Sequence, residues 1–191
     1  MYGAAVHVCC PHAVIVADKF HVLRRVLAQV DRVRAEVQGQ AKGKGAGLEL
    51  FRRRSLFTAD AKTLDRDQRR DLAKLLRKYP ELARAWRLAQ RFRRLYRAGS
   101  RHEAAMALHR WWQDVRTRGP HQFLGLRHIL THWREEILNY FDYRVTNGFA
   151  EGKNNRIKVI IRSGYGYRNL ENLGLRILMT NHPASYAAAP C

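Results

Sequence analysis

The sequence predicts a predominantly helical α/β protein, in which an all-helical segment interrupts a small core that contains strands. Two observations indicate this fold class. The run 13–18 is short, apolar and largely β-branched, which is typical of a buried strand. Between residues 60 and 140, apolar residues recur every three or four positions, as in amphipathic helices. We therefore expect residues 1–59 to form the N-terminal part of the core, 60–140 a helical insertion and 141–191 the C-terminal part of the core.

The first part should contain a strand, a long helix and an irregular stretch. Valine and leucine at helical spacing predict a helix over about residues 19–38. Four glycines within 39–47 predict a loop, and a second short strand is expected around Leu56 and Phe57.

Four helices are expected in the middle segment. The first ends before Pro80, which occupies a preferred position in the first turn of the second. Ser100 and Glu103 have the spacing of a capping box and should begin the third helix. Gly119 and Pro120 end it, and the fourth should run over about 121–140.

One helix near the C-terminal end carries a narrow polar stripe. At about 100° per residue, its polar side chains fall within roughly a third of the circumference. The stripe consists of Glu151, Asn154, Asn155, Lys158 and Arg162. A carboxylate among amides and cations suits a site that holds a divalent cation and DNA phosphate. A solvated face stabilised by pairs four residues apart is the alternative. After a glycine turn at 164–166, a short terminal helix is expected.

Asp18 ends the first predicted strand, and two roles are open for it. An acid at the carboxyl end of a buried strand is a common position for a catalytic carboxylate. The same residue could instead cap the helix that follows. His21 could orient Asp18 or contact DNA, or it could pack at the corner between strand and helix.

The charge of the chain indicates a polyanionic partner. Lysine and arginine total 36 against 16 acidic residues, giving a formal net charge of +20. Nucleic acid is the usual partner of such a chain. A generic basic protein is a weaker alternative, because four tryptophans indicate a folded core. An anionic membrane surface is also a weaker alternative, because no lysine-rich amphipathic N-terminus is present.

Cysteine usage and hydropathy point to the cytoplasm. Three cysteines without a CxxC pair favour a reducing compartment and no zinc site. No apolar run is long enough for a membrane span, and no signal peptide is recognisable.

Two groups of arginines are candidates for phosphate contact. Arg52, Arg53 and Arg54 are consecutive and form either a solvated patch or a phosphate-binding patch. A second group shares the outer face of the predicted helix after Pro80. Its members are Arg84, Arg87, Arg91 and Arg94.

Three blocks of sequence resemble the ISL3-type DDE transposases of bacterial insertion sequences. Residues 16–22 (VADKFHV) resemble the family's "DxFHV" block. Residues 146–158 (TNGFAEGKNNRIK) resemble its "TNgxxEGxNNxIK" block, and 162–169 (RSGYGYRN) resemble the "RxxyGyrN" tail that follows. The order of the blocks and the helical material between them also agree, so the resemblance covers essentially the whole chain.

The resemblance implies an RNase H-like core and a role in DNA recombination. Asp18 would be the second and Glu151 the third acid of the DDE triad, together holding Mg²⁺ or Mn²⁺. DNA would be the partner, with a second copy of the chain or a full-length transposase as a further one. The residues we expect to contact DNA are Lys153, Asn154, Asn155, Lys158, Arg162, Arg168, Arg52, Arg53 and Arg54.

One departure from the family pattern affects activity. Tyr2 and the stretch 11–13 match the family's residues just after its first acid, so that acid should fall before Met1. We therefore expect an incomplete RNase H-like core and a chain that is inactive by itself. The alternative function is a non-catalytic DNA-binding protein or transposition inhibitor derived from a truncated transposase. A decayed product without a stable fold is a third possibility, because unpaired strand edges promote aggregation.

Overall fold

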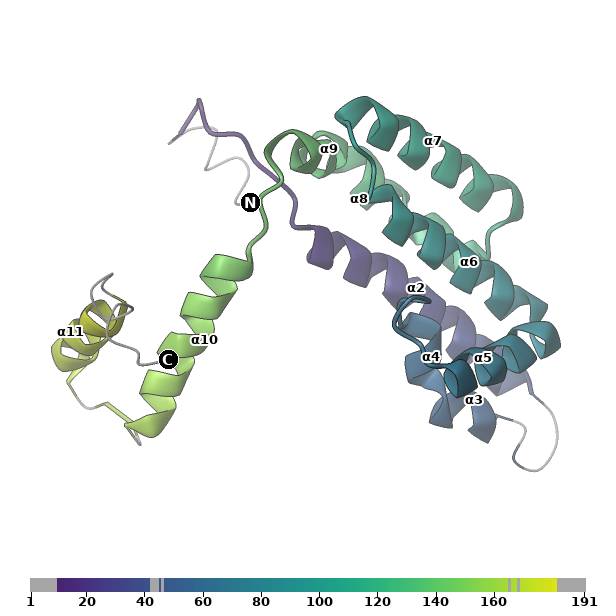
Figure 1. Ribbon diagram of the computed structural model, residues 1–191, viewed down its shortest axis with the longest axis horizontal. Coiled ribbons are helices and arrows are strands. Elements are labelled where there is room, and N and C mark those ends of the chain that lie inside the picture. Colours follow the sequence, from purple (N-terminus) through teal and green to yellow (C-terminus); the bar gives the residue numbers. More distant parts are fainter. Residues whose placement is uncertain (1–9, 42–44, 46, 165, 168, 182–191) are drawn as a thin grey trace. The chain divides into compact units, whose positions relative to one another are not determined.

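A computed structural model describes residues 10–41, 45, 47–164, 166–167 and 169–181. The chain divides into two compact units, Met1–Val145 and Thr146–Cys191. In the described ranges the regular structure is helical and no strand occurs, so the prediction of a predominantly helical protein is confirmed (Figure 1). None of the helices in these ranges is both long enough and apolar enough to cross a membrane.

The first unit is built around the long helix α2 (Lys19–Gln40), as the valine spacing predicted. Helix α6 lies between α2 and α7 and packs against both (Figure 1). Helices α3, α4 and α9 and the 3₁₀ segment η1 also pack against α2. The remaining bounds are α3 Leu48–Arg52, α4 Arg54–Thr58, α5 Arg66–Lys78, α6 Pro80–Leu95, α7 Arg101–Arg118, η1 His121–Leu126, α8 Arg127–His132 and α9 Arg134–Tyr143.

One hydrophobic core runs through this unit. Val26 and Val30 on α2, Leu82 on α6 and Phe123 on η1 are completely buried. Trp111 on α7 is buried as well, and its ring packs edge-on against Phe92 with centroids 4.9 Å apart. The core therefore joins residues from 19–58 to residues from the helical segment 60–145.

The expected strand at 13–18 is wrong. This segment has no regular secondary structure, and its backbone groups bond to α9 instead. The amide of Ala17 donates to the carbonyl of Glu136 at 2.9 Å, and Asn139 Nδ2 donates to the carbonyl of Ile15 at 2.8 Å. A strand requires a row of backbone partners on a neighbouring strand, and a helix offers only isolated groups.

The strand expected around Leu56 and Phe57 is also wrong. These residues belong to α4, which packs with α3 against α2. Leu50, Leu56 and Phe57 are all buried there. A short apolar run fits a buried strand and a buried helical turn equally well, and the neighbouring α2 decided between them.

The helix boundaries in the middle segment follow their capping residues. Pro80 lies in the first turn of α6, and the Ser100 hydroxyl accepts from the Glu103 amide at 3.2 Å at the start of α7.

The single helix expected over 121–140 is wrong, because η1, α8 and α9 replace it. The chain leaves helical geometry at Trp133, where φ is −103° and ψ is 22°.

The described part of the second unit forms helices α10 (Gly148–Ser163) and α11 (Leu170–Asn181), which pack against each other. Both were expected. Few of their apolar side chains are covered: Ile160 is buried, whereas Val159 and Ile161 on α10 are exposed. On α11 the exposed ones are Leu170, Leu175, Leu178 and Met179.

Candidate functional site

Asp18 caps the N-terminus of α2. Its Oδ1 accepts hydrogen bonds from the amide of Phe20 at 2.7 Å and from the amide of His21 at 3.3 Å. The capping role is therefore confirmed. The amides and the positive end of the helix dipole both stabilise the ionised carboxylate at this position.

The surroundings of Asp18 are aromatic and partly closed. Its side chain is only 13% exposed. Burial, followed by the negative charge of Asp18, raises the pKa of the Tyr96 hydroxyl. That hydroxyl has no hydrogen-bond partner among the described residues, and its ring packs against Tyr140 with centroids 5.4 Å apart. Lys19 Nζ donates to the Tyr140 hydroxyl at 3.3 Å.

His21 is not packed at the corner, because its side chain is 58% exposed. Its Nδ1 lies 3.6 Å from Asp18 Oδ1. This distance is too long for a good hydrogen bond, but it allows an ion pair when the imidazole is protonated. The position is compatible with orienting Asp18 or contacting a ligand.

The polar stripe predicted on α10 is present as an exposed face. Glu151, Asn154, Asn155, Lys158 and Arg162 are all exposed, while Ile157 is half-buried and Ile160 is buried on the other side. Glu151 lies in the first turn of α10, where the helix dipole favours a negative charge.

The stripe is not held together by internal pairs. Within the described part of the chain, none of its five side chains makes a hydrogen bond or an ion pair. The stripe is therefore a solvated face, as the alternative expected, but pairs four residues apart do not form among its five described side chains. Its amides and cations remain available to a ligand. Lys153 is half-buried, and Arg168 lies outside the described residues.

Asp18 and Glu151 have side chains that suit a hard cation, but among the described residues neither unit brings enough acids together for a cation site. Carboxylate oxygens are the donors that Mg²⁺ and Mn²⁺ prefer. Among the described residues no group of three or more His, Cys, Asp or Glu side chains could hold a metal ion. Asp18 belongs to the first unit and Glu151 to the second, and one carboxylate in either unit is too few.

The run Arg52–Arg54 lies far from Asp18 along α2. Gly47, just before α3, approaches Gln38 near the end of α2, whereas Asp18 caps its beginning. The rise of a helix of this length is about 30 Å. Arg53 pairs with Asp71, and Arg54 stacks on Phe51 with the guanidinium 4.8 Å from the ring centroid. Arg52 is exposed.

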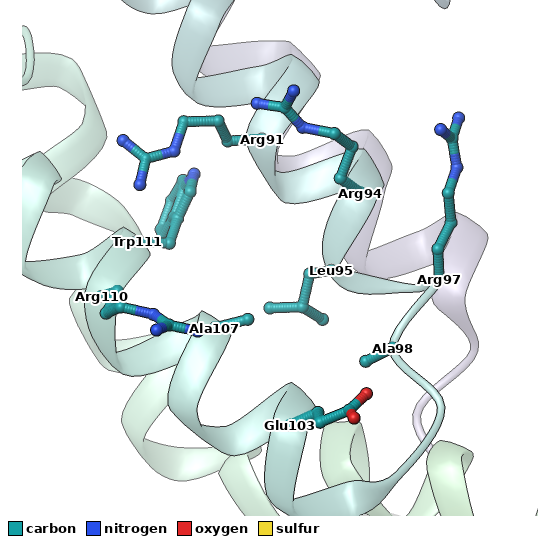
Figure 2. Close-up of a pocket in the computed structure, with 9 residues that line it drawn as sticks. All are labelled: Arg91, Arg94, Leu95, Arg97, Ala98, Glu103, Ala107, Arg110 and Trp111. Atoms are coloured by element: carbon teal, nitrogen blue, oxygen red, sulfur yellow. The ribbon is translucent and has the colours of Figure 1, made fainter.

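A basic hollow lies between α6 and α7 in the first unit. It has a volume of about 530 Å³, and its lining includes Arg91 and Arg94 from α6 and Arg110 from α7 (Figure 2). The α6 arginines could be found from the sequence because they share a helical face. Arg110 could not, since only the packing of α7 against α6 brings it there.

Comparison with known proteins agrees with the resemblance of the three blocks. A family model described as a transposase of the ISL3 type matches residues 1–177. The transposase for insertion sequence element IS1001 of Bordetella parapertussis is 29% identical over 178 residues. This match covers 92% of the chain but 44% of that relative, so the chain spans less than half of the relative's length. No solved structure matches. The family model covers most of the sequence, and the chain therefore belongs to the ISL3 family of transposases.

Proposed function

We propose that this chain acts on DNA as part of a metal-dependent transposase, and that the exposed face of α10 lies against the DNA backbone. The observation that carries the proposal is the stripe of one carboxylate, two amides and two cations, unpaired within the described residues. It stands in a chain with a net charge of +20 that belongs to a transposase family.

The residues of α10 have distinct roles in this proposal. Lys158 and Arg162 would neutralise phosphates, and Asn154 and Asn155 would donate hydrogen bonds to phosphate or sugar oxygens. Such contacts fix the position of the duplex without reading its sequence. Lys153, Arg168 and the run Arg52–Arg54 are additional proposed contacts of the same kind.

The proposal assigns Asp18 and Glu151 to one cation site for Mg²⁺ or Mn²⁺ in the assembled core. The bound ions would supply charge stabilisation for displacement at phosphorus. The protein's part is to hold two carboxylates at helix N-termini, where the positive end of the helix dipole favours negative charge. The RNase H-like α/β core belongs to this proposal as well, with the helical segment as its insertion.

Binding to duplex DNA tests the partner. The affinity for unrelated duplexes should be similar and should fall steeply between 50 and 200 mM salt, because counterions are released from each phosphate contacted. Lys158→Gln together with Arg162→Gln should lower the slope of log affinity against log salt by about two. Absence of binding at 50 mM salt would remove DNA as the partner.

Mn²⁺ titration tests the shared cation site. If Asp18 and Glu151 hold one ion, Asp18→Asn and Glu151→Gln should each weaken Mn²⁺ binding, and the double variant should lose less than the sum of both losses. Glu171→Gln on α11 changes the same charge at an exposed position and is the matched control. Additive losses from Asp18 and Glu151 would contradict a shared site.

A further inference from the structure

We propose that the groove between α6 and α7 is a second DNA contact, one that holds consecutive phosphates of one strand of a duplex. This inference rests on the proposed function in taking DNA as the partner. The groove belongs entirely to the first unit, so it shares no residue with the stripe on α10.

The groove consists of two adjoining hollows. The larger, of about 530 Å³, is shown in Figure 2, where side chains of α6 and α7 surround Leu95 and Trp111. The second, of about 340 Å³, shares Arg91 with the first and continues toward Arg84 and Arg118. The basic side chains along both hollows are Arg84, Arg87, Arg91 and Arg94 from α6, Arg97 just after α6, which pairs with Asp60, and Arg110 and Arg118 from α7.

The two carboxylates of the groove are occupied by neighbouring groups. Asp114 forms an ion pair with Arg91. Glu103 Oε2 accepts from the amide of Gly99 at 2.8 Å, beside the start of α7. These two acids offset at most two of the positive charges along the hollows, so the groove keeps a net positive charge.

Most of the arginines in the groove have no protein partner. Arg84, Arg87, Arg94, Arg110 and Arg118 make no side-chain hydrogen bond or ion pair in the described ranges, and all five are exposed. Like charges gathered on one surface repel each other and oppose folding. A bound polyanion would remove this cost, because each phosphate replaces a repulsion between arginines with an attraction.

The length of the arginine row fits a strand of nucleic acid better than a single phosphate. From Arg84 to Arg94 the α6 backbone rises about 15 Å. One strand of a duplex carries a phosphate about every 3.4 Å of axis, and consecutive phosphates also wind around that axis, so the row can face more than one phosphate of a strand but not a long run. Planar guanidinium groups are also well suited to phosphate oxygens, to which they can donate two parallel hydrogen bonds.

The floor of the groove favours a duplex over a single strand. Proteins that bind single strands stack the bases on exposed aromatic rings. The aromatic residue in the lining is Trp111, which is only 2% exposed and donates its indole N–H to the carbonyl of Leu88 at 2.8 Å. Leu95 beside it is buried. The groove therefore presents guanidinium groups at its rim and no stacking face, as a contact with a paired backbone requires.

A charge-matched comparison tests this groove. The double variant Arg94→Gln, Arg110→Gln removes two exposed arginines that have no described partner, so no carboxylate is left unpaired. Arg66→Gln together with Lys74→Gln removes two exposed charges from α5, which packs against α4 and α6. Both variants should fold like the parent, as judged by circular dichroism and melting temperature.

The measured quantity is the affinity of the whole chain for a 20-base-pair duplex of arbitrary sequence at 0.1 M salt. The groove variant should bind about tenfold more weakly for each arginine removed, and its salt slope should fall by about two. The α5 variant should lose no more than about threefold, because its charges act only over a distance that salt screens.

Each other outcome contradicts a defined part of the proposal. Equal losses in the two variants would show that net charge alone matters, and the groove assignment would be wrong while DNA remained the partner. A larger loss on a single strand or on an RNA duplex than on DNA would reject the assignment to duplex DNA. If the unaltered chain does not bind DNA, both the groove and the proposed function are overturned.

Discussion

The two units of this chain differ in how completely they cover their own apolar surface. In the first unit α2, α6 and α7 bury large side chains from one another, and Trp111, Phe92 and Phe123 lie deep in a shared core. In the second unit α10 and α11 pack together, yet Leu170, Leu178 and others on α11 stay exposed.

Because of this difference, the unit that contributes most to the stability of the chain is not the unit that carries Glu151. Hydrophobic burial provides most of the free energy of folding, so the first unit holds most of the chain's stability. The polar face that carries Glu151 stands on the unit with little core of its own. Exposed apolar patches of this kind mark surfaces that other parts of a protein cover. We therefore expect the second unit to depend on further packing for its full stability.

The largest expected effect is the loss of a core aromatic from the first unit. Phe92→Ala removes a completely buried ring that packs against Trp111, and it should lower the free energy of unfolding by about 3–5 kcal/mol. Leu178→Ala on α11 removes an exposed side chain and should change it by less than about 0.5 kcal/mol. Urea unfolding followed by far-ultraviolet circular dichroism, which reports the helices of both units, measures both. Similar losses would contradict the contrast between the units.

Amide hydrogen exchange should show the same contrast without a mutation. Amides in the middle of α6 should exchange at least about a hundredfold more slowly than those of α11, because local opening is easier where few apolar contacts are broken. Mass spectrometry of peptic fragments at neutral pH measures the difference. Equal protection in both helices would show that the second unit is as stable as the first.

Removing the polar contacts that join α7 to α9 should have a smaller effect on the free energy of unfolding. The guanidinium of Arg101 bonds to Glu135, Asp142 and Asn139, and the hydrogen bond to Asp142 is the main reason that its pKa is raised. Arg101→Met should lower the free energy of unfolding by about 1 kcal/mol, because these pairs are partly screened by water. Arg116→Met removes an exposed arginine of the same helix and should have no measurable effect.

The smallest expected effect is the pH-dependent contribution of the Glu49 carboxylate to the stability of the fold. Hydrogen bonds from Lys78 and then from Tyr79 hold the pKa of Glu49 below its ordinary value. A carboxylate with a lowered pKa in the folded state stabilises the protein above its unfolded pKa, and this contribution is lost as the pH falls through the folded value.

Glu49→Gln should therefore lower the urea midpoint at pH 7, and the difference from the parent should shrink below about pH 4. Glu171→Gln in the second unit, where the side chain is exposed, is the control and should leave the midpoint unchanged at both pH values. A difference for Glu49→Gln that grew in acid would have the wrong sign.

Much of the helical architecture could be predicted from local signals. The valine spacing gave α2 almost its full length, and Pro80 and Ser100 marked the starts of α6 and α7. These signals are local, because a cap or a helical face involves residues within a few positions of each other. The polar face of α10 was predictable for the same reason.

The candidate sites were predictable only in part. Asp18 was identified with two possible roles, and the hydrogen bonds of the folded chain established the cap. Arg84, Arg87, Arg91 and Arg94 could be placed on one face of a helix, but Arg110 and Arg118 join them only through the packing of α7 against α6. Residues that become neighbours through helix packing are distant in the sequence, so no periodic pattern in the sequence predicts their contact.

The sequence by itself determined where α2, α6 and α7 begin, which face of α10 is polar and how basic the chain is. Only the tertiary structure decided that the runs at 13–18 and 56–57 are not strands, since a short apolar run takes the form its neighbours allow. Backbone groups of 13–18 form hydrogen bonds with α9, and Leu56 and Phe57 belong to α4, which packs against α2. The physical reason is that helices satisfy their own hydrogen bonds locally, whereas strands and grooves exist only between distant segments.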